Sequence, residues 1–454
     1  MAPSYRSPTR FQPSFSLVLL AVFLLALWLA GGASRADVAG QVVVRATAWA
    51  VLIAAVLLSR MHRVGGSRAP WVFLIVAAAI AMVQLIPLPP SLWQSLPGRE
   101  LFVEAGQPAV WRPLSIVPTA TMNALSSLVV PLAVLVLMAG LSDGDQRWLP
   151  TLLMVLVGLS LLLGLLQFSG AGFDSPLING TPGDVGGPFA NRNHFALFLA
   201  VACLIAPVWA FADRKWLRWS APVALGITLL SLLMILATGS RAGLLLGGLA
   251  LILALLLAQR DVQRTLRHRA RWVFPAAVAG LIAVVAIFLL LSVAADRAAS
   301  FDRLLAGDAG QDMRTRGLPT VLAAISTYFP TGAGLGGFDP IFRLNEPASL
   351  LKPTYFNHAH NDFLEIALDT GIVGLILLVA GLGWWIWASV QAWRHGNRLA
   401  KLGFAILLLV IAASLVDYPM RTPLMLAIAT IAAVWLSGRD EPEVGNGSAL
   451  PNIA

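Results

Sequence analysis

Two histidines stand one residue apart in the stretch NHAHNDFLE, Asn357 to Glu365, although the chain of 454 residues contains only six histidines. Imidazole titrates near pH ~6.5 and is the usual general base at neutral pH. The spacing of His358 and His360 also fits a pair of metal ligands, for which Asp362 and Glu365 would have to complete the site. The stretch therefore predicts proton transfer or, with weaker support, metal binding.

Three acids follow the histidines at helical spacing. Asp362, Glu365 and Asp369 are related as i, i+3 and i+7, which places them on one face of a helix that continues into an apolar run. An acid at a helix N-terminus is favourable in itself, and this explains Asp362 better than Asp369, which lies deeper in the apolar run. We expect one of these acids to orient a histidine.

Arginines in two other segments have the chemistry to bind phosphate. Arg241 follows the TGS break between two apolar runs, and its guanidinium could hold a phosphate through two parallel hydrogen bonds. It could equally extend to lipid head groups or pair with an acid. Arg314 and Arg316 lie in a long polar segment, where solvated loop charges are the simpler interpretation of these residues taken alone.

Two further segments carry residues suited to binding a polar ligand. The stretch PFANRNHFA places four consecutive polar residues before an apolar run, namely Asn191, Arg192, Asn193 and His194. The stretch TGAGLGGFDPIF is rich in glycine, so its backbone amides could approach a phosphate. It lacks the Gly-Lys-Ser/Thr signature and the strand–helix context of a nucleotide loop, and a plain turn is the simpler explanation.

The elements that must position these residues are apolar. The chain is 58% apolar and 12% charged, with a mean hydropathy of +0.79, whereas soluble domains are about 45–50% apolar and about 25% charged. The apolar runs are long, continuous and rich in Leu, Ala and Val, which favours membrane-spanning helices over a barrel. The net charge of +9 fits arginines in cytoplasmic loops better than nucleic-acid binding. The single cysteine, Cys203, excludes an intrachain disulfide.

Twelve apolar stretches are long enough to span the hydrocarbon core. They lie at about 14–31, 42–59, 70–88, 121–141, 149–168, 194–212, 219–238, 241–258, 272–294, 364–392, 401–416 and 422–437. The loops that are rich in Lys and Arg alternate along the chain, which predicts that both termini are cytoplasmic. Cleavage of the first stretch as a signal peptide would invert this order, so we expect it to be retained.

We thus predict an all-α polytopic membrane protein with about 12 transmembrane helices. Residues 1–437 would form a single transmembrane domain, with a large periplasmic loop at 295–363 between helices 9 and 10. Residues 438–454 would form a short, disordered cytoplasmic tail. The segment RTRGLPTVLAAISTYF of the large loop has the pattern of a short amphipathic helix.

The candidate site residues share one predicted face of the membrane. Besides the arginines and histidines above, this face receives Asp417 and Arg421, which form the turn between the last two spans. Membrane helices avoid charge because its desolvation is costly, and charges that persist near the bilayer usually serve a site. This convergence is the main evidence for function in the sequence.

Five segments together resemble a known group of proteins. GPFANRNHFA, TGSRAG, MRTRG, TGAGLGGFDPIF and NHAHNDFLEIALDTGIVGL occur in the order and topology of the bacterial O-antigen ligase and Wzy-type polysaccharide polymerase superfamily. The resemblance covers roughly residues 150–437. Its most specific part is the histidine–asparagine motif followed by the TGIVGL glycines, and SRAG is the next.

The resemblance implies a glycosyltransferase of the bacterial inner membrane, with a fold related to the GT-C class and an active site that faces the periplasm. Such enzymes pass a glycan from undecaprenyl diphosphate to a hydroxyl, with inversion, and need no nucleotide sugar and no metal, so no cofactor is expected. By position, His360 with Asn361 matches the family motif, and Arg241 matches the helix-end arginine. Arg314 or Arg316 matches the loop arginine.

We therefore predict His360, His358 and Arg241 as catalytic residues. The residues predicted to bind the diphosphate or the glycan are Arg241, Arg314, Arg316, Asn361, Asn191, Arg192, His194 and Glu365. Fixed arginines would stabilise the leaving diphosphate in place of a divalent metal, and an imidazole would accept the proton of the attacking hydroxyl. The expected partners are the lipid-linked donor, a glycan or lipid A core acceptor and membrane lipid, and no nucleic acid.

Two alternatives stay open. A transporter or flippase of lipid-linked glycan would have charged residues near the bilayer midplane and often an internal repeat, whereas here the polar groups gather at one face. A protein O-oligosaccharyltransferase would use the same chemistry on a protein acceptor, although such relatives often carry an additional C-terminal soluble region. Nothing in the sequence separates a ligase from a polymerase.

Overall fold

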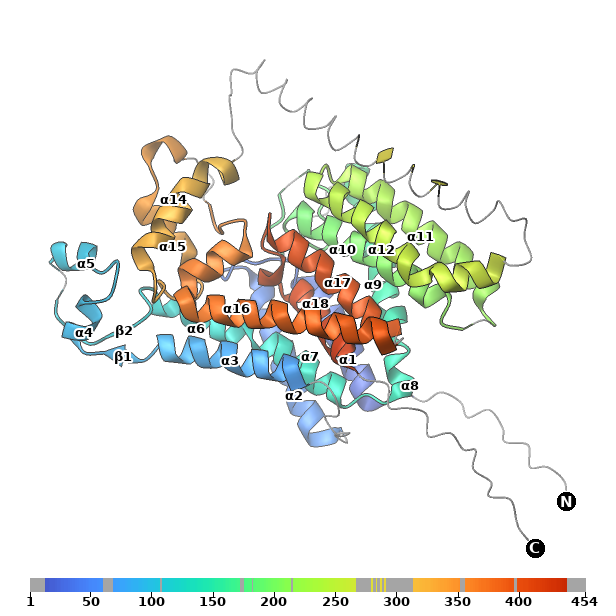
Figure 1. The fold of residues 1–454 in the computed structure, drawn as a ribbon, viewed down its shortest axis with the longest axis horizontal. Helices are drawn as coiled ribbons and strands as arrows, with labels where there is room; N and C mark the ends of the chain where they lie inside the picture. Colours follow the sequence, from blue (N-terminus) through green and yellow to red (C-terminus); the bar gives the residue numbers. More distant parts are fainter. Residues whose placement is uncertain are drawn as a thin grey trace, which may run out of the picture.

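The protein is built almost wholly from helices. The computed structural model describes residues 13–59, 68–106, 108–171, 175–181, 183–213, 215–266, 279–280, 283, 286–287, 290, 313–351, 356–395 and 398–438. The helices of the bundle are α1 (Phe15–Ala30), α2 (Ala39–Leu58), α3 (Arg68–Gln84), α6 (Pro118–Ser127), α7 (Val129–Ala139), α9 (Leu149–Phe168), α10 (Arg192–Ala210), α11 (Leu217–Ala237), α12 (Arg241–Leu266), α16 (Asp362–His395), α17 (Arg398–Ser414) and α18 (Pro423–Ser437). Figure 1 shows α3 running beside α16, and α10, α11 and α12 grouped together.

The described helices overlap every predicted apolar stretch except 272–294, which lies mostly outside the described residues. Within the described part of the chain, seven helices are long and apolar enough to cross a membrane, and three shorter ones are also apolar. The protein is therefore an all-α membrane protein, while the number of twelve spans stays a prediction. Residues 439–454 of the proposed tail and residues 295–312 of the loop at 295–363 also lie outside the described residues.

Short elements connect the helices at one end of the bundle, which we call the site end. They are β1 (Pro87–Leu88), α4 (Pro90–Gln94), α5 (Glu100–Glu104), β2 (Arg112–Pro113), α14 (Met313–Tyr328), α15 (Phe338–Asn345), η1 (Ala348–Leu350) and η2 (Pro419–Arg421). Strands β1 and β2 pair antiparallel. The helix α14 coincides with the amphipathic segment predicted from the sequence. The short helix α8 (Asp143–Gln146) lies at the opposite end (Figure 1).

A buried arginine fixes the connection between α3 and α6. The Arg99 side chain is fully buried and donates hydrogen bonds to the carbonyls of Pro97 and Leu114 at 2.8 and 2.6 Å. Its guanidinium also lies over the rings of Trp93 and Tyr328. Burial lowers the pKa of Arg99 to about 10, so it remains charged at neutral pH, and the connection is joined to α14 by packing and not by sequence proximity.

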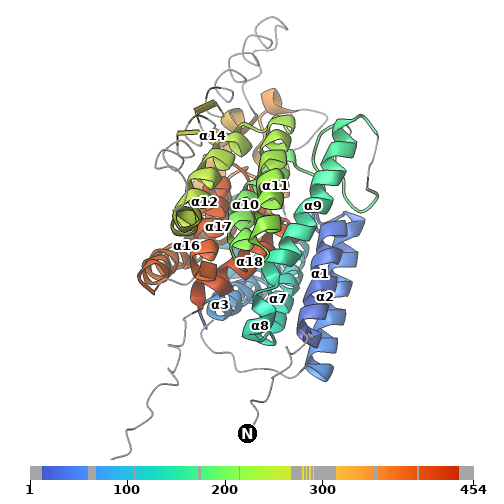
Figure 2. The ribbon, with the colours of Figure 1, turned by 90° about the vertical axis from the view of Figure 1, so that its right-hand side faces the viewer.

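The helix α10 is the central element of the bundle. Of the residues in its apolar stretch, 78% are buried inside the protein, a larger share than for the other candidate spans. It packs against α9, α11, α12 and α17, and Figure 2 shows it enclosed among its neighbours. Close packing of this kind has little freedom to shift, so residues at the N-terminus of α10 are held in fixed positions.

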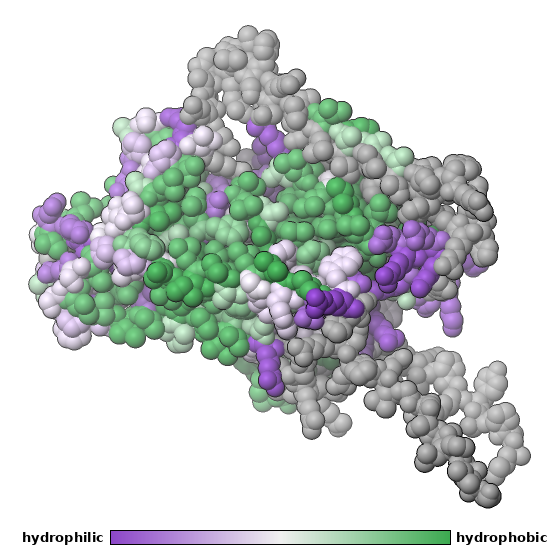
Figure 3. Space-filling model, viewed as in Figure 1, coloured by the Kyte–Doolittle hydropathy of each residue, from purple (hydrophilic) through white to green (hydrophobic). Residues whose placement is uncertain are grey.

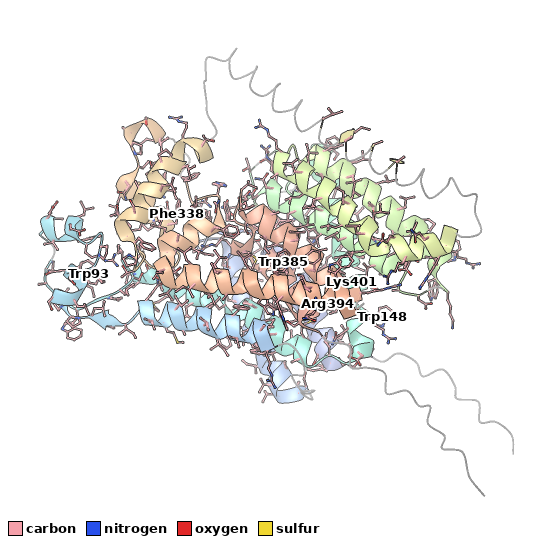
Figure 4. The ribbon with its side chains drawn as sticks, in the orientation of Figure 1. Trp93, Trp148, Phe338, Trp385, Arg394 and Lys401 are labelled. Atoms are coloured by element: carbon pink, nitrogen blue, oxygen red, sulfur yellow. The ribbon has the colours of Figure 1, made fainter. Side chains whose placement is uncertain are left out.

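The surface agrees with a membrane environment. Figure 3 shows an apolar band over most of the visible face, with hydrophilic residues gathered toward the two ends. Figure 4 places Trp93 and Phe338 at the site end, and Trp148, Arg394 and Lys401 toward the other. This is the arrangement expected of a bundle whose apolar middle contacts lipid and whose ends contact water and head groups.

Helix α16 is broken near the site end. Gly371 has φ +57° and ψ −140° inside an otherwise helical run. The amide of Ile372 donates a hydrogen bond to the carbonyl of Pro330 at 2.9 Å instead of continuing the helix. A Cβ atom at position 371 would lie 1.9 Å from that carbonyl oxygen, so only glycine fits. The break holds the segment after α14 against the first turns of α16.

Candidate functional site

A buried aspartate joins three helix ends at the centre of the site end. Asp417 is 2% exposed and lies between α17 and α18. Its carboxylate accepts hydrogen bonds from the side-chain amides of Asn193 and Asn191, at 2.7 and 3.2 Å, and from the amide of Tyr418 at 3.0 Å. Nε2 of His194 lies 3.8 Å away. The start of α10 is thereby fixed to the turn before α18.

Both histidines of the NHAHNDFLE stretch face a buried carboxylate through Nδ1. Nδ1 of His360 lies 3.2 Å from Oδ1 of Asp417, and Nδ1 of His358 lies 2.9 Å from Oε1 of Glu365. A carboxylate on Nδ1 fixes the tautomer and orientation of an imidazole and leaves Nε2 as the atom that exchanges a proton with a ligand. The expectation that an acid of α16 orients a histidine is confirmed for Glu365 and His358.

His360 has a left-handed backbone conformation, with φ +49°. Such a conformation is sparsely populated by residues other than glycine, although histidine is among the types that adopt it more readily. It turns the chain sharply just before α16, where Asn361 accepts hydrogen bonds from the amides of Phe363 and Leu364 at 3.0 and 3.1 Å. Asn361 also donates to the carbonyl of Leu415 at 2.9 Å. These contacts anchor the histidine turn to the helix that it precedes.

Arg421 is surrounded by the three acids of α16. Its guanidinium lies 3.3 Å from Glu365, 3.5 Å from Asp362 and 3.5 Å from Asp369. The predicted common face of these acids is therefore confirmed. Burial opposes the charge of Arg421, but the surrounding carboxylates outweigh it and raise its pKa above the usual value. Because three acids share this one arginine, Arg421 acts first as their counter-charge.

The glycine-rich stretch Thr331–Phe342 uses its backbone amides within the protein. The amides of Ala333 and Gly334 donate to the carbonyls of Leu368 and Asp369 at 2.8 and 2.9 Å. The amide of Gly336 donates to the Asp369 carboxylate at 3.1 Å. The stretch is thus a structural turn that packs against the break in α16, as the simpler interpretation of its sequence holds.

The turn is also joined to α3. The side chain of Gln84 donates to the carbonyl of Asp369 at 2.9 Å and accepts from the amide of Leu335 at 2.9 Å. Gln84 is buried, so these bonds satisfy both ends of its amide where water is excluded. One side chain at the end of α3 therefore connects the glycine-rich stretch to α16.

The aromatic ring of Tyr418 contacts all three histidines of the site. Its centroid lies 4.2 Å from that of His358, 4.9 Å from that of His360 and 5.1 Å from that of His194. Burial raises the pKa of the Tyr418 hydroxyl, and the Asp417 carboxylate adds to this shift. The tyrosine is therefore a neutral packing surface that separates the three imidazoles.

Arg241, one of the arginines predicted to bind phosphate, is connected to the Asp417 carboxylate through hydrogen-bonded neighbours. Arg241 begins α12 directly after Ser240, whose hydroxyl donates to the side chain of Asn193 at 2.7 Å. Gly239, with φ +62°, makes the turn that leads into this helix. Arg241 is thus two hydrogen-bonded residues away from Asp417, at the edge of the same polar network.

Among the described side chains, Arg192 and Arg316 make their contacts away from the histidine centre. The Arg192 guanidinium lies 3.7 Å from Asp184. Arg316 donates to the carbonyl of Ser349 at 2.5 Å, which holds α14 to η1. Arg314 is in α14, with its side chain outside the described residues. The roles predicted for these arginines stay predictions.

A cavity of about 920 Å³ opens beside the histidine centre. Its polar mouth includes His358, Arg421, Asn357 and residues 34–37. Its deeper wall is apolar and consists of side chains from α3, α16, α17 and α18, namely Ala77, Ala81, Leu378, Leu382, Leu407, Val410, Ile411 and Leu426. Cavities of this size hold ligands of several hundred daltons. The division into a polar mouth and an apolar depth suits an amphiphile.

The histidines do not share one metal site. His358 faces Glu365 and His360 faces Asp417, so the two Nδ1 atoms are committed to different carboxylates. In the described part of the chain, no group of three His, Cys, Asp or Glu side chains is arranged to hold a metal ion. The expectation of a reaction that needs no metal stays a prediction.

Sequence reasoning placed Asp417 and Arg421 on the correct face without assigning them a role. Tyr418, Gln84 and the cavity residues of α2 were missed. The signal for Gln84 is a polar side chain at the end of an apolar helix, and such residues are often tied to a partner far away in the sequence. Tyr418 carried no signal, because an aromatic residue between two membrane helices is common.

These features together define a polytopic helical membrane protein with a buried histidine–carboxylate centre at one end of the bundle. Residues 226–379 match the family described as O-antigen ligase. The matched region runs from within α11 into α16 and includes Arg241, α14 and both histidines. The match confirms the resemblance seen in the sequence and suggests a ligase- or polymerase-type membrane enzyme. A search of curated proteins found no match.

Proposed function

We propose that the protein transfers a glycan from undecaprenyl diphosphate to a hydroxyl acceptor at the periplasmic face of the inner membrane. One observation carries this proposal. Two histidines each have Nδ1 on a buried carboxylate, and one of them, His358, lines a cavity whose mouth is polar and whose depth is apolar. A lipid-linked sugar has matching parts, because its isoprenoid chain is apolar and its reacting end is charged.

His360 is the general base in this proposal. Asp417 holds Nδ1 of His360, so Nε2 accepts the proton of the acceptor hydroxyl as its oxygen attacks the anomeric carbon. The bond between that carbon and the phosphate oxygen breaks, and the diphosphate leaves with the electron pair. A single displacement of this kind inverts the configuration at the anomeric carbon. His358, which lines the cavity, contacts the sugar or shares the proton.

Cations must stabilise the negative charge that grows on the leaving diphosphate. Arg241 is predicted for this role because it begins α12 next to Ser240 at the edge of the Asp417 network. Arg314 or Arg316 of α14 would approach from the loop. Arg421 contributes less, since the acids of α16 already surround it.

Transport of the same lipid is the competing function, and the acids of α16 argue against it. Asp369 is the deepest of them in the helix and is fully buried. Its carboxylate lies 3.5 Å from Arg421 and accepts from the amide of Gly336. A proton- or ion-coupled carrier needs such a group to face a water-filled path, whereas Asp369 is engaged in a structural contact.

Reconstitution with a defined donor tests the proposal. Purified protein in vesicles is given undecaprenyl-diphosphate-linked glycan and a hydroxyl acceptor, and transfer is followed by gel mobility and mass. We expect transfer by the wild type, loss of at least about 100-fold in His360→Ala, and wild-type activity in His395→Ala, a control at the far end of α16. Absence of transfer by the wild type with every acceptor class would refute the proposal.

Glycan profiling after deletion of the gene separates the acceptor classes. Long polymer that accumulates on undecaprenyl diphosphate indicates a ligase, and single repeat units that accumulate there indicate a polymerase. Loss of glycan from a secreted or surface protein indicates protein glycosylation. An unchanged glycan profile would contradict all three versions of the proposal.

A further inference from the structure

The cavity contains one arginine whose charge is not balanced by an acid. Its lining includes three arginines and three aspartates. Asp37 pairs with Arg35, Asp339 pairs with Arg343, and Asp362 pairs with Arg421. The arginine left over is Arg45, and no carboxylate of the described residues lies within ion-pairing distance of it.

Arg45 lies inside a membrane-spanning helix. It is the seventh residue of α2 (Ala39–Leu58), which is one of the seven candidate spans. At 1.5 Å per residue it lies roughly 9 Å below the start of the helix. A charge at such a depth is costly unless it has a partner or a wet surface to face. The charge of Arg45 therefore needs a partner, such as a bound anion.

A hydrogen bond fixes the side chain of Arg45, but one of its buried N–H donors has no partner among the described residues. Nη2 donates to the side chain of Asn123 in α6, which also lines the cavity. Nε is buried and has no hydrogen-bond partner within the described part of the chain. An arginine that extended to the lipid head groups would expose these nitrogens. Instead, Arg45 is oriented by Asn123 at the wall of the cavity.

We propose that Arg45, positioned by Asn123, binds the phosphate of the lipid-linked donor in this cavity. The inference rests on the proposed function and adds a residue of α2, which lies outside the region 226–379 that matches the family. Charge complementarity supports a phosphate, because a guanidinium with unused N–H groups can donate two parallel hydrogen bonds to the oxygens of a phosphate. The apolar side chains of the deeper cavity wall, among them Ala81 and Leu426, would contact the isoprenoid chain.

This placement also accounts for the position of His358. His358 and Arg45 line the same cavity, so a phosphate at Arg45 leaves the attached sugar near the histidine end of the mouth. Arg35 lies in the same mouth and is paired with Asp37. It therefore offers less net charge to the ligand than Arg45 does. The donor would enter with its chain between α3 and α16–α18 and its head toward the histidines.

A binding measurement that needs no turnover tests the inference. Radiolabelled undecaprenyl diphosphate is bound to purified protein in nanodiscs, for the wild type, Arg45→Gln and Arg45→Lys. Arg218→Gln serves as the matched control, because Arg218 is exposed on α11, its guanidinium lies over the ring of Trp219, and it does not line the cavity. Undecaprenol, which lacks the phosphates, is measured in parallel.

We expect Arg45→Gln to weaken binding of undecaprenyl diphosphate by about tenfold or more, because a charge-assisted pair is lost. Binding of undecaprenol should not change, which also shows that the variant is folded. Arg45→Lys should recover part of the loss, and Arg218→Gln should bind as the wild type does. Equal binding in Arg45→Gln, or an equal loss for undecaprenol, would overturn the inference.

Two further outcomes separate this inference from others. Competition by phosphatidylglycerol as strong as that by undecaprenyl diphosphate would assign Arg45 to ordinary phospholipid and would also overturn it. If the wild type transfers glycan and Arg45→Gln leaves the donor KM unchanged, the inference fails and the proposed function stands. If the wild type binds the diphosphate through Arg45 but transfers nothing, the proposed function fails and the binding assignment stands.

Discussion

Nδ1 of His360 lies 3.2 Å from a carboxylate oxygen of Asp417, and the same carboxylate receives the side-chain amides of Asn191 and Asn193. The histidine turn before α16, the start of α10 and the turn before α18 therefore meet at one buried group. Since Ser240 joins Asn193 at 2.7 Å, the start of α12 is connected to it as well. The orientation of the proposed base depends on four separate parts of the chain.

Asp417→Asn should lower the turnover of the proposed reaction by up to about 10⁴-fold, because the amide no longer fixes the tautomer of His360. The KM for the donor should change little, since Asp417 does not line the cavity. Steady-state kinetics in vesicles measure both quantities. Asp143→Asn, in α8 at the opposite end, is the matched control. A variant with wild-type turnover would show that His360 needs no carboxylate partner.

Arg421→Gln should destabilise the protein strongly, because it leaves the acids of α16 buried without their arginine. Loss of one partner of a buried ion pair typically costs about 3–5 kcal/mol. Thermal unfolding in detergent measures the change. Addition of Glu365→Gln to this variant should restore part of the stability, since it removes one of the uncompensated charges. If the single variant is as stable as the wild type, the acids do not depend on Arg421.

Arg241→Lys separates a requirement for charge from a requirement for geometry. If Arg241 holds the diphosphate with two parallel hydrogen bonds, the lysine variant should lose at least about tenfold in kcat/KM, and Arg241→Ala should lose more. Assays of transfer at several donor concentrations test this. Arg260→Lys, on the same helix near its other end, is the control. Full activity of Arg241→Lys would mean that a point charge is sufficient.

Purified protein should transfer glycan in the presence of EDTA, because fixed arginines are proposed to stabilise the leaving group. The measurement compares initial rates before and after chelation, and again after Mg²⁺, Mn²⁺ or Ca²⁺ is added. Rates that agree within error support the proposal. Loss of activity that is restored by one of these ions would show that a metal takes part.

The helical architecture was predictable because apolar runs of this length have few alternatives in a membrane. The acids at 362, 365 and 369 were correctly placed on one face, since helical periodicity is a local property. Glu365 could be expected to orient a histidine for the same reason, as it follows His358 closely in the sequence.

The contacts across the bundle could not be predicted. Asp417 belongs to a turn between two helices, and nothing in its local sequence indicates that it meets Asn193 of α10 or His360 before α16. The charge balance of the cavity was equally hidden, because it depends on which acid each arginine faces. The sequence around Arg45 gives it no role, and it becomes informative only because Asp37, Asp339 and Asp362 each have another partner.

The pairing of α16 with Arg421 also has a consequence for biogenesis. The three acids of α16 leave the ribosome before α17 and before Arg421, yet a buried acid raises the cost of moving a helix into lipid, by up to about 2.5–3.5 kcal/mol at the helix centre. We expect α16 to wait at the translocon, or to insert only shallowly, until the hairpin of α17 and α18 arrives with its arginine. Chains truncated after α16 should therefore be extracted from membranes more readily than chains that extend through α18.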